Sequence, residues 1–199
     1  MIKNIVFDFG QVLVRFDPRY MVTRYVTDDA DAAQLEEVLF DRLYWDRLDA
    51  GTITDNEVMT EAKKRLPERL FEVAEKIYFN WIYNIPEIEG MRELLSQLRE
   101  KGYRLYLLSN ICTYFASHAD EIPILKLLDG CVFSAVAGHV KPSREIYNHL
   151  CRRFAIEPSE TGFVDDRDEN IEGAINAGWS GVLFNGDARE LRTRFLNED

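Results

Sequence analysis

The stretch Ile5-Val6-Phe7-Asp8-Phe9-Gly10-Gln11-Val12-Leu13 places one carboxylate between two apolar runs near the start of the chain. The run before Asp8 is short and rich in β-branched and aromatic residues, which is typical of a buried strand. Taken alone, an aspartate at a strand end is more often a turn residue or a helix N-cap than a functional group. The rest of the chain has to decide between these interpretations.

Four further apolar runs resemble the first and alternate with helical patterns. We expect strands at residues 5–9, 104–109, 131–135, 162–165 and 181–184. Between them, apolar residues recur with helical spacing at Met91, Leu94, Leu95 and Leu98, and at Ile171, Ala174 and Ile175, with Gly178 ending the second helix. Buried strands separated by helices predict an α/β fold with an open parallel sheet.

The segment 16–86 interrupts this alternation, because it contains helical patterns and no convincing strand. One apolar face comprises Leu35, Val38 and Leu39, and another comprises Phe71, Ala74, Ile77, Tyr78, Trp81 and Ile82. Thr54 and Glu57 fit a capping box, which predicts a helix start. We therefore expect an α/β core formed by residues 1–15 and 87–199, with residues 16–86 inserted as an all-helical cap.

The charge and cysteine content exclude several classes of function. With 24 basic and 35 acidic residues the net charge is −11, so a nucleic-acid partner is not expected. Cys112, Cys131 and Cys151 lie far apart and lack CxxC spacing, which argues against a disulfide framework or a zinc site. The N-terminal apolar run is too short for a signal peptide, and no stretch is long enough for a membrane span. We expect a cytoplasmic protein that is a monomer or a weak homo-oligomer.

Polar side chains follow four of the expected strands, and open parallel sheets bind ligands beyond those carboxyl ends. The adjacent carboxylates of Asp165 and Asp166 repel each other, and a nearby cation would relieve that cost. The residues at the four ends are Asp8; Ser109 and Asn110; His139, Lys141 and Pro142; and Asp165, Asp166 and Asn170.

These groups supply complementary chemistry. Asp8 and one carboxylate of the Asp165–Asp166 pair offer the oxygen ligands that Mg²⁺ prefers. Ser109 offers a hydroxyl and Lys141 a positive charge. Phosphoryl transfer needs positioning, charge neutralisation and an in-line nucleophile. The sequence therefore predicts a site for a small phosphorylated metabolite.

Four motifs in order resemble those of the haloacid dehalogenase superfamily of hydrolases: VFDFGQVL (6–13), LLSN (107–110), VKP (140–142) and FVDDRDENIEGA (163–174). The resemblance covers essentially the whole chain and implies a Rossmann-like core with a helical cap. It also implies a Mg²⁺-dependent phosphatase with a phospho-aspartate intermediate. The implied roles are nucleophile and metal ligand for Asp8; metal ligand for the Gly10 carbonyl and for Asp166; phosphoryl binding for Ser109, the Asn110 amide and Lys141; and support for Asp165 and Asn170.

Gly10 departs from the family pattern, because phosphatases of this superfamily usually carry a general acid and base aspartate two residues after the nucleophile. Such a group typically contributes 10²–10⁴-fold in rate. Three consequences are open. The first is a substrate with an intrinsically good leaving group. The second is another residue, such as Gln11, Asp17 or His139, in place of the missing acid and base. The third is slow turnover. A branch with a similar glycine-containing first motif includes a bacterial phosphatase of α-D-glucose 1-phosphate, which favours a sugar-1-phosphate.

Two other functions remain as alternatives. A metal-independent 2-haloacid dehalogenase would use Asp8 to attack carbon, but the Asp165–Asp166 pair argues against it. A non-catalytic module that binds phosphorylated ligands is supported only by Gly10. In the cap, Tyr44, Trp45 and Trp81 could stack on a sugar ring, although the spacing of Trp81 favours a place in the cap core.

Overall fold

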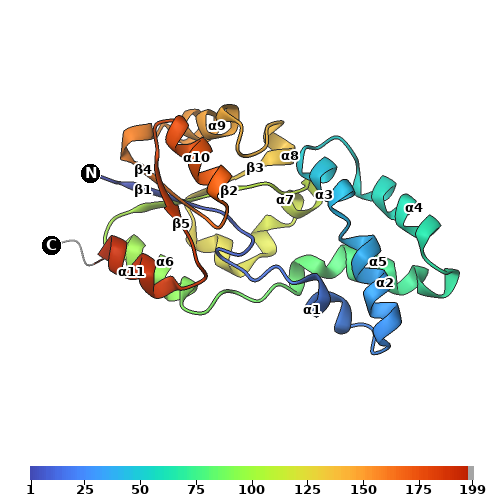
Figure 1. Cartoon of the computed structure of the whole chain (residues 1–199). Coiled ribbons are helices and arrows are strands. Elements are labelled where there is room, and N and C mark those ends of the chain that lie inside the picture. Colours follow the sequence, from blue (N-terminus) through green and yellow to red (C-terminus); the bar gives the residue numbers. More distant parts are fainter. Residues whose placement is uncertain (197–199) are drawn as a thin grey trace.

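Five parallel strands form one open sheet in the computed structural model, which describes residues 1–196 (Figure 1). The strand order is β3-β2-β1-β4-β5, and β1 lies between β2 and β4 with Val6 paired to Tyr106 and Phe163. The α/β expectation is thereby confirmed. The strands are β1 (Asn4–Phe7), β2 (Arg104–Ser109), β3 (Gly130–Phe133), β4 (Thr161–Asp165) and β5 (Ser180–Leu183).

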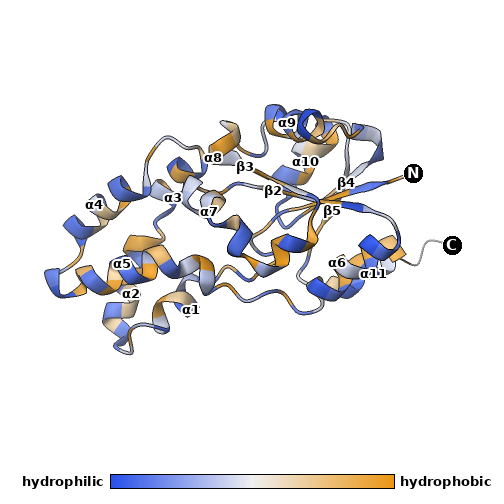
Figure 2. Ribbon diagram, turned by 180° about the vertical axis from the view of Figure 1, so that it is seen from behind, coloured by the Kyte–Doolittle hydropathy of each residue, from blue (hydrophilic) through white to orange (hydrophobic). Residues whose placement is uncertain are grey.

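Helices cover both faces of this sheet (Figure 1). On one face lie α6 (Met91–Glu100) and α11 (Ala188–Leu196), and on the other lie α9 (Arg144–Phe154) and α10 (Asp168–Asn176). Alternate residues of β1 therefore enter different cores: Phe7 packs into one apolar cluster and Val6 into the other. The outer helices α4 (Asp55–Arg65) and α9 are mostly hydrophilic in Figure 2.

Residues 16–86 form helices and turns and no strand, as expected for the inserted region. The capping box of Thr54 and Glu57 is present at the start of α4. The helices are α1 (Pro18–Thr23), α2 (Asp29–Leu39), α3 (Arg42–Asp49), α4 and α5 (Phe71–Asn80), with 3₁₀ turns η1 (Glu68–Leu70) and η2 (Trp81–Tyr83). The region occupies the end of the molecule beyond the carboxyl ends of the strands (Figure 1).

Two linkers join the helical region to the sheet and run side by side. The amide of Arg15 donates to the carbonyl of Pro86 at 2.8 Å, and that of Ile88 donates to the carbonyl of Leu13 at 3.0 Å. These linkers lie where the sequence predicts the boundaries between core and cap. The division into two domains itself stays a prediction.

Three local predictions need correction. The strand expected at 131–135 ends at Phe133, because Ser134 begins the short helix α8 (Ser134–Ala137) and its hydroxyl accepts a hydrogen bond from the Ile111 amide. The strand expected at 5–9 ends at Phe7, because the chain turns with three amides donating to the Phe9 carbonyl. Ile175, expected in the buried face of α10, is 54% exposed at the outer side of that helix.

The remaining connections are short. They are α7 (Thr113–Ser117), η3 (Ala119–Glu121), η4 (Pro123–Leu127) and η5 (Pro158–Glu160). Within residues 1–196, none of the helices has the length and apolarity needed to cross a membrane. The three cysteines are free thiols, as the sequence predicts.

Candidate active site

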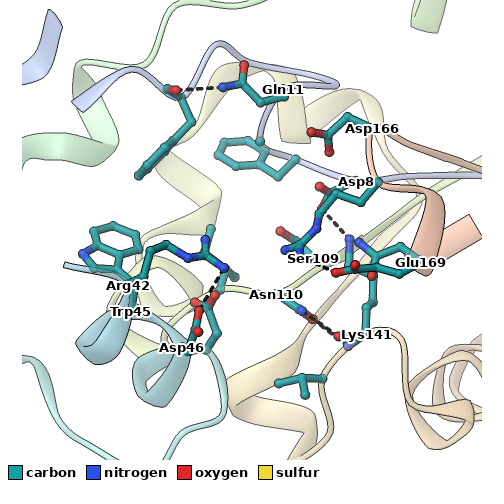
Figure 3. Close-up of a pocket in the computed structure, with 18 of the residues that line it drawn as sticks. Asp8, Gln11, Arg42, Trp45, Asp46, Ser109, Asn110, Lys141, Asp166 and Glu169 are labelled. Atoms are coloured by element: carbon teal, nitrogen blue, oxygen red, sulfur yellow. Dashed lines mark hydrogen bonds and ion pairs between the residues drawn. The ribbon is translucent and has the colours of Figure 1, made fainter. Parts of the chain in front are cut away.

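A cavity of about 530 Å³ opens at the carboxyl ends of β1, β2 and β4, between the sheet and α3. It lies beside β1, where the strand order reverses, which is the usual ligand position in open α/β sheets. Four chain segments far apart in sequence meet there (Figure 3). The lining residues from the sheet side include Asp8, Gly10, Ser109, Asn110, Lys141, Asp166 and Asn170.

Lys141 is the central cation of this site. Its Nζ lies 2.8 Å from Asp8 Oδ1 and 2.7 Å from Asp165 Oδ2, and its side chain is buried. Burial lowers the pKa of Lys141, but the charges of Asp8 and Asp165 outweigh it and leave the pKa above its usual value. Burial raises the pKa of Asp8; Lys141 opposes this rise, and Asp165 adds to it. The lysine is therefore a fixed positive charge beside Asp8.

Asp165 and Asp166 have different surroundings. Asp165 is fully buried, and it accepts hydrogen bonds from the Arg167 amide at 2.9 Å and the Asn170 side chain at 2.9 Å, besides Lys141. Asp166 is half-buried and lines the cavity near Asp8 (Figure 3). Burial raises the pKa of Asp166, and the charge of Asp165 raises it further.

The loops that carry these groups are tied to one another. The side chain of Asn110 donates to the Lys141 carbonyl at 3.0 Å and accepts from the Lys141 amide at 2.8 Å. Helix α10 packs closely against the loop that carries Lys141 and Pro142. At Gly173 of this helix, an added Cβ atom would lie 2.7 Å from the Pro142 carbonyl oxygen. The Lys141–Pro142 peptide bond is cis. The sequence did not indicate that the Asn110 side chain would link these two loops by hydrogen bonds.

Three carboxylates converge beside the lysine, since oxygens of Asp8, Asp165 and Asp166 all lie within 4.8 Å of one another. Among residues 1–196, Lys141 is the one cationic side chain that pairs with this cluster, through Asp8 and Asp165, so excess negative charge remains. Hard oxygen donors at this spacing fit a magnesium ion, which takes one or two carboxylates and keeps several waters. Gly10 borders the same cavity, and a metal-ligand role for its carbonyl stays a prediction.

The opposite wall comes from the helical region and is partly aromatic. Phe16, Trp45 and Trp81 pack edge to face with centroids 5.3 to 5.7 Å apart, and all three line the cavity. Trp81 is also buried in the core, as its spacing predicts, and the Trp45 indole donates to the Leu39 carbonyl at 2.8 Å. Tyr44, expected as a further stacking residue, is not among the residues that line the cavity.

The three residues suggested as replacements for the missing acid and base either form other hydrogen bonds or lie outside the cavity. Asp17 caps α1 by accepting from the Tyr20 amide at 2.9 Å. Gln11 borders the cavity but donates its side-chain amide to the Phe16 carbonyl at 2.9 Å (Figure 3). His139 is exposed and does not line the cavity.

One cavity carboxyl, Asp49 at the end of α3, was not among the predicted site residues. Its side-chain Oδ1 is buried and has no hydrogen-bond partner among the described residues. Helix α3 ends here in the turn Asp49-Ala50-Gly51. The sequence does not show that the turn docks over Asp8.

The fold and the site define a hydrolase with an open parallel α/β core, an inserted helical region and a carboxylate cluster beside a buried lysine. The sequence profile of the haloacid dehalogenase-like hydrolases matches residues 2–178, and the chain belongs to this family.

Individual relatives agree with this assignment. The D-ribitol-5-phosphate phosphatase of Bacteroides thetaiotaomicron is 30% identical over 86% of this chain and 86% of its own length. A predicted HAD-like family hydrolase from Porphyromonas gingivalis superposes with a TM-score of 0.73 at 27% identity, covering 100% of both chains. A HAD family enzyme of Bacteroides thetaiotaomicron, solved with magnesium and inorganic phosphate, shares the fold with a TM-score of 0.71 at 21% identity, over 96% of this chain and 99% of that one.

Proposed function

We propose that this protein is a magnesium-dependent phosphomonoesterase that forms a phospho-aspartate on Asp8. The observation that carries the proposal is the position of Asp8, which contacts Lys141 and lies within a three-carboxylate cluster at the floor of the cavity. A phosphate group needs positive charge, and the chain has an acidic surface. A cation in the cluster together with Lys141 supplies that charge locally.

Asp8, Asp166 and the carbonyl of Gly10 would hold the metal ion, with Asp165 and Asn170 supporting them. When bound, magnesium neutralises the charge of the phosphate and of the carboxylates. Support comes from the carboxylate spacing and from the related enzyme solved with magnesium and inorganic phosphate. Asp166 suits a direct ligand because it faces the cavity, whereas Asp165 is saturated by three donors.

The proposed reaction has two steps. A carboxylate oxygen of Asp8 attacks phosphorus, and the bond to the ester oxygen breaks. Lys141, Ser109 and the amide of Asn110 bind the phosphoryl oxygens and hold the group in line. Water then attacks the phosphorus of the aspartyl phosphate and releases inorganic phosphate. The covalent route divides one difficult displacement into two easier ones.

The substrate class we propose is a small phosphorylated sugar or polyol. The cavity is of the size that takes a small metabolite, and Trp45 and Trp81 offer aromatic faces to a carbon skeleton. Arg42 and Asp46 add polar groups at the rim. The relative that hydrolyses D-ribitol 5-phosphate supports a polyol phosphate, and the glycine-containing first motif supports a sugar-1-phosphate. A panel of pentitol phosphates, sugar-1-phosphates and sugar-6-phosphates separates these choices.

The activity itself is tested with p-nitrophenyl phosphate. We expect phosphate release with Mg²⁺, none with a chelator, and none from Asp8→Asn under either condition. Chloride release from a 2-haloacid in the presence of chelator, without phosphatase activity, would instead show a dehalogenase. Thermal stabilisation by phosphorylated ligands without turnover would show a binding module.

A further inference from the structure

The proposed phosphatase lacks a proton donor next to its nucleophile, because Gly10 has no side chain. Backbone geometry does not require glycine there. Its φ angle lies outside the left-handed region, and a Cβ atom would meet nothing nearer than Phe16 Cβ at 3.8 Å. An alkoxide is a poor leaving group, so a metabolite phosphate needs an acid from elsewhere in the cavity.

We propose that Asp49, supplied by the helical region, is the general acid that protonates the leaving oxygen and the general base for the attacking water. This inference rests on the proposed phosphatase function and adds a catalytic residue to it.

The first support is the location of Asp49. It ends α3 and lines the same cavity as Asp8 and Asp166, on the wall opposite the sheet. The hydroxyl of Ser134, the first residue of α8, donates to the backbone carbonyl of Asp49 at 2.6 Å. Two residues on, Gly51 lies so close to α8 that a Cβ atom would be 2.9 Å from the Ala135 carbonyl oxygen. The end of α3 at Asp49 is therefore held against α8, the short helix that follows β3.

The second support is that the carboxyl group of Asp49 forms no ion pair within the part of the chain that the structure describes. Its buried Oδ1 has no hydrogen-bond partner among residues 1–196. Buried polar atoms without partners are rare, and a catalytic role is one recognised reason for keeping one. Asp46, on the same helix, is exposed and paired with Arg42 at 2.9 Å, while Glu169 is paired with Arg167. Asp8 and Asp166 belong to the carboxylate cluster.

The charge environment of Asp49 suits proton transfer. Burial raises the pKa of its carboxyl to about 7; Arg42 lowers it, Asp46 and Asp8 raise it, and Lys141 lowers it. Cys112 also faces it, from the loop after β2, and burial raises the pKa of that thiol to about 12. A carboxyl populated in both protonation states near neutral pH can donate in one step and accept in the next.

The protons balance over the two steps. In the first, Asp8 attacks phosphorus, the bond to the ester oxygen breaks, and the proton of the Asp49 carboxyl passes to that oxygen to give a neutral alcohol. In the second, water attacks the phosphorus of the aspartyl phosphate and gives a proton to the Asp49 carboxylate, while the bond to Asp8 breaks. Both side chains return to their starting forms.

The test compares two leaving groups in Asp49→Asn with Mg²⁺ present. The quantity is kcat/KM, which ends at the first irreversible step and so reports departure of the leaving group. For an alkyl phosphate we expect a loss of about 10²–10⁴-fold, the usual contribution of a general acid. For p-nitrophenyl phosphate, whose leaving group needs no proton, we expect little change. A burst of p-nitrophenolate followed by a slow steady state should appear, because hydrolysis of the intermediate loses its base.

Glu169→Gln is the matched control, because it removes another cavity carboxyl, which is paired with Arg167 and is not among the groups that shift the pKa of Asp49. It should affect the two substrates to the same extent. Thermal denaturation confirms that each variant folds. The double variant Gly10→Asp, Asp49→Asn places a carboxyl group on the sheet side of the cavity instead. We expect it to recover part of the activity on the alkyl phosphate.

The outcomes separate the two proposals. If the wild-type protein releases no phosphate with Mg²⁺, or if Asp8→Asn remains active, the phosphatase function itself is wrong. Suppose instead that the wild-type protein is active and Asp8→Asn is not. If Asp49→Asn then lowers kcat/KM equally for the two substrates, or for neither, the role of Asp49 is overturned. Selective loss with the alkyl substrate establishes it.

Discussion

The hydroxyl of Ser134 donates a 2.6 Å hydrogen bond to the backbone carbonyl of Asp49. It is a direct link between the sheet and the end of α3, and the same hydroxyl accepts a bond from the Ile111 amide at 2.9 Å. Ser134 is fully buried, so both backbone groups depend on it. The position of Asp49 over the cavity is therefore set by a residue outside the helical region.

Replacing Ser134 by alanine should destabilise the protein and weaken catalysis. We expect a loss of about 1–3 kcal/mol in the free energy of unfolding, because a buried amide and a partly buried carbonyl lose their partner. Urea denaturation measures it. Ser143→Ala is the control: its hydroxyl is buried without a partner among the described residues, so its loss should cost less. Equal effects of the two variants would show that the Ser134 bonds are not important.

Lys141→Met should lower stability as well as abolish activity. The change leaves Asp8 and Asp165 facing each other in a buried site, and removing one partner of a buried ion pair costs about 3–5 kcal/mol. Unfolding is measured in chelator, so that no cation replaces the lysine. Lys64→Met, which breaks an exposed pair with Glu61, should change stability by no more than about 0.5 kcal/mol. A stable Lys141→Met protein would contradict this account of the charge balance.

Gly173→Ala should disturb the loop that carries Lys141. The added Cβ atom would lie 2.7 Å from the Pro142 carbonyl oxygen and 2.9 Å from the Tyr147 hydroxyl. Overpacking of this kind costs about 1–3 kcal/mol, and the shift of α10 should also reduce activity. Gly162→Ala in β4 meets only ordinary contacts, the nearest at 3.7 Å, and should be tolerated better. Calorimetric melting of both variants decides the point.

Asp49→Asn should change how stability depends on pH. The pKa of Asp49 in the folded protein is about 7, above the ordinary value of 3.8. The unfolded chain therefore loses this proton first, and stability falls as pH rises from about 4 to about 7. The amide variant escapes that penalty, which is at most roughly 4 kcal/mol. The difference between variant and wild type should be small at pH 4, grow towards pH 7 and then level off. A constant difference would mean that Asp49 is not a buried acid.

Much of the fold is predictable because the signals are local. Strands such as β2 consist of continuous apolar runs, and the pairing of Thr54 with Glu57 marks the start of α4. The site on the sheet side is predictable for a geometric reason, since parallel strands bring their carboxyl ends to one edge. Asp8 and Lys141 are 133 positions apart, yet their side chains form an ion pair.

What the sequence does not reveal depends on how the helical region docks. Periodicity shows that α3 is a helix, but not that Asp49 faces the cavity. Asp17 and His139 lie near the motifs in sequence, yet Asp17 caps a helix and His139 lies on the surface. Ser134 continues an apolar run, and only its tertiary hydrogen bonds explain why the strand ends before it.

The most direct test of the account is to trap the intermediate on Asp8. The protein with Mg²⁺ is mixed with limiting p-nitrophenyl phosphate, quenched in acid during a single turnover, digested and examined by mass spectrometry. We expect one phosphoryl group on the peptide that contains Asp8, more of it in Asp49→Asn, and none when a chelator is present. Rapid phosphate release with no phosphorylated Asp8 peptide at any time would contradict the proposed mechanism.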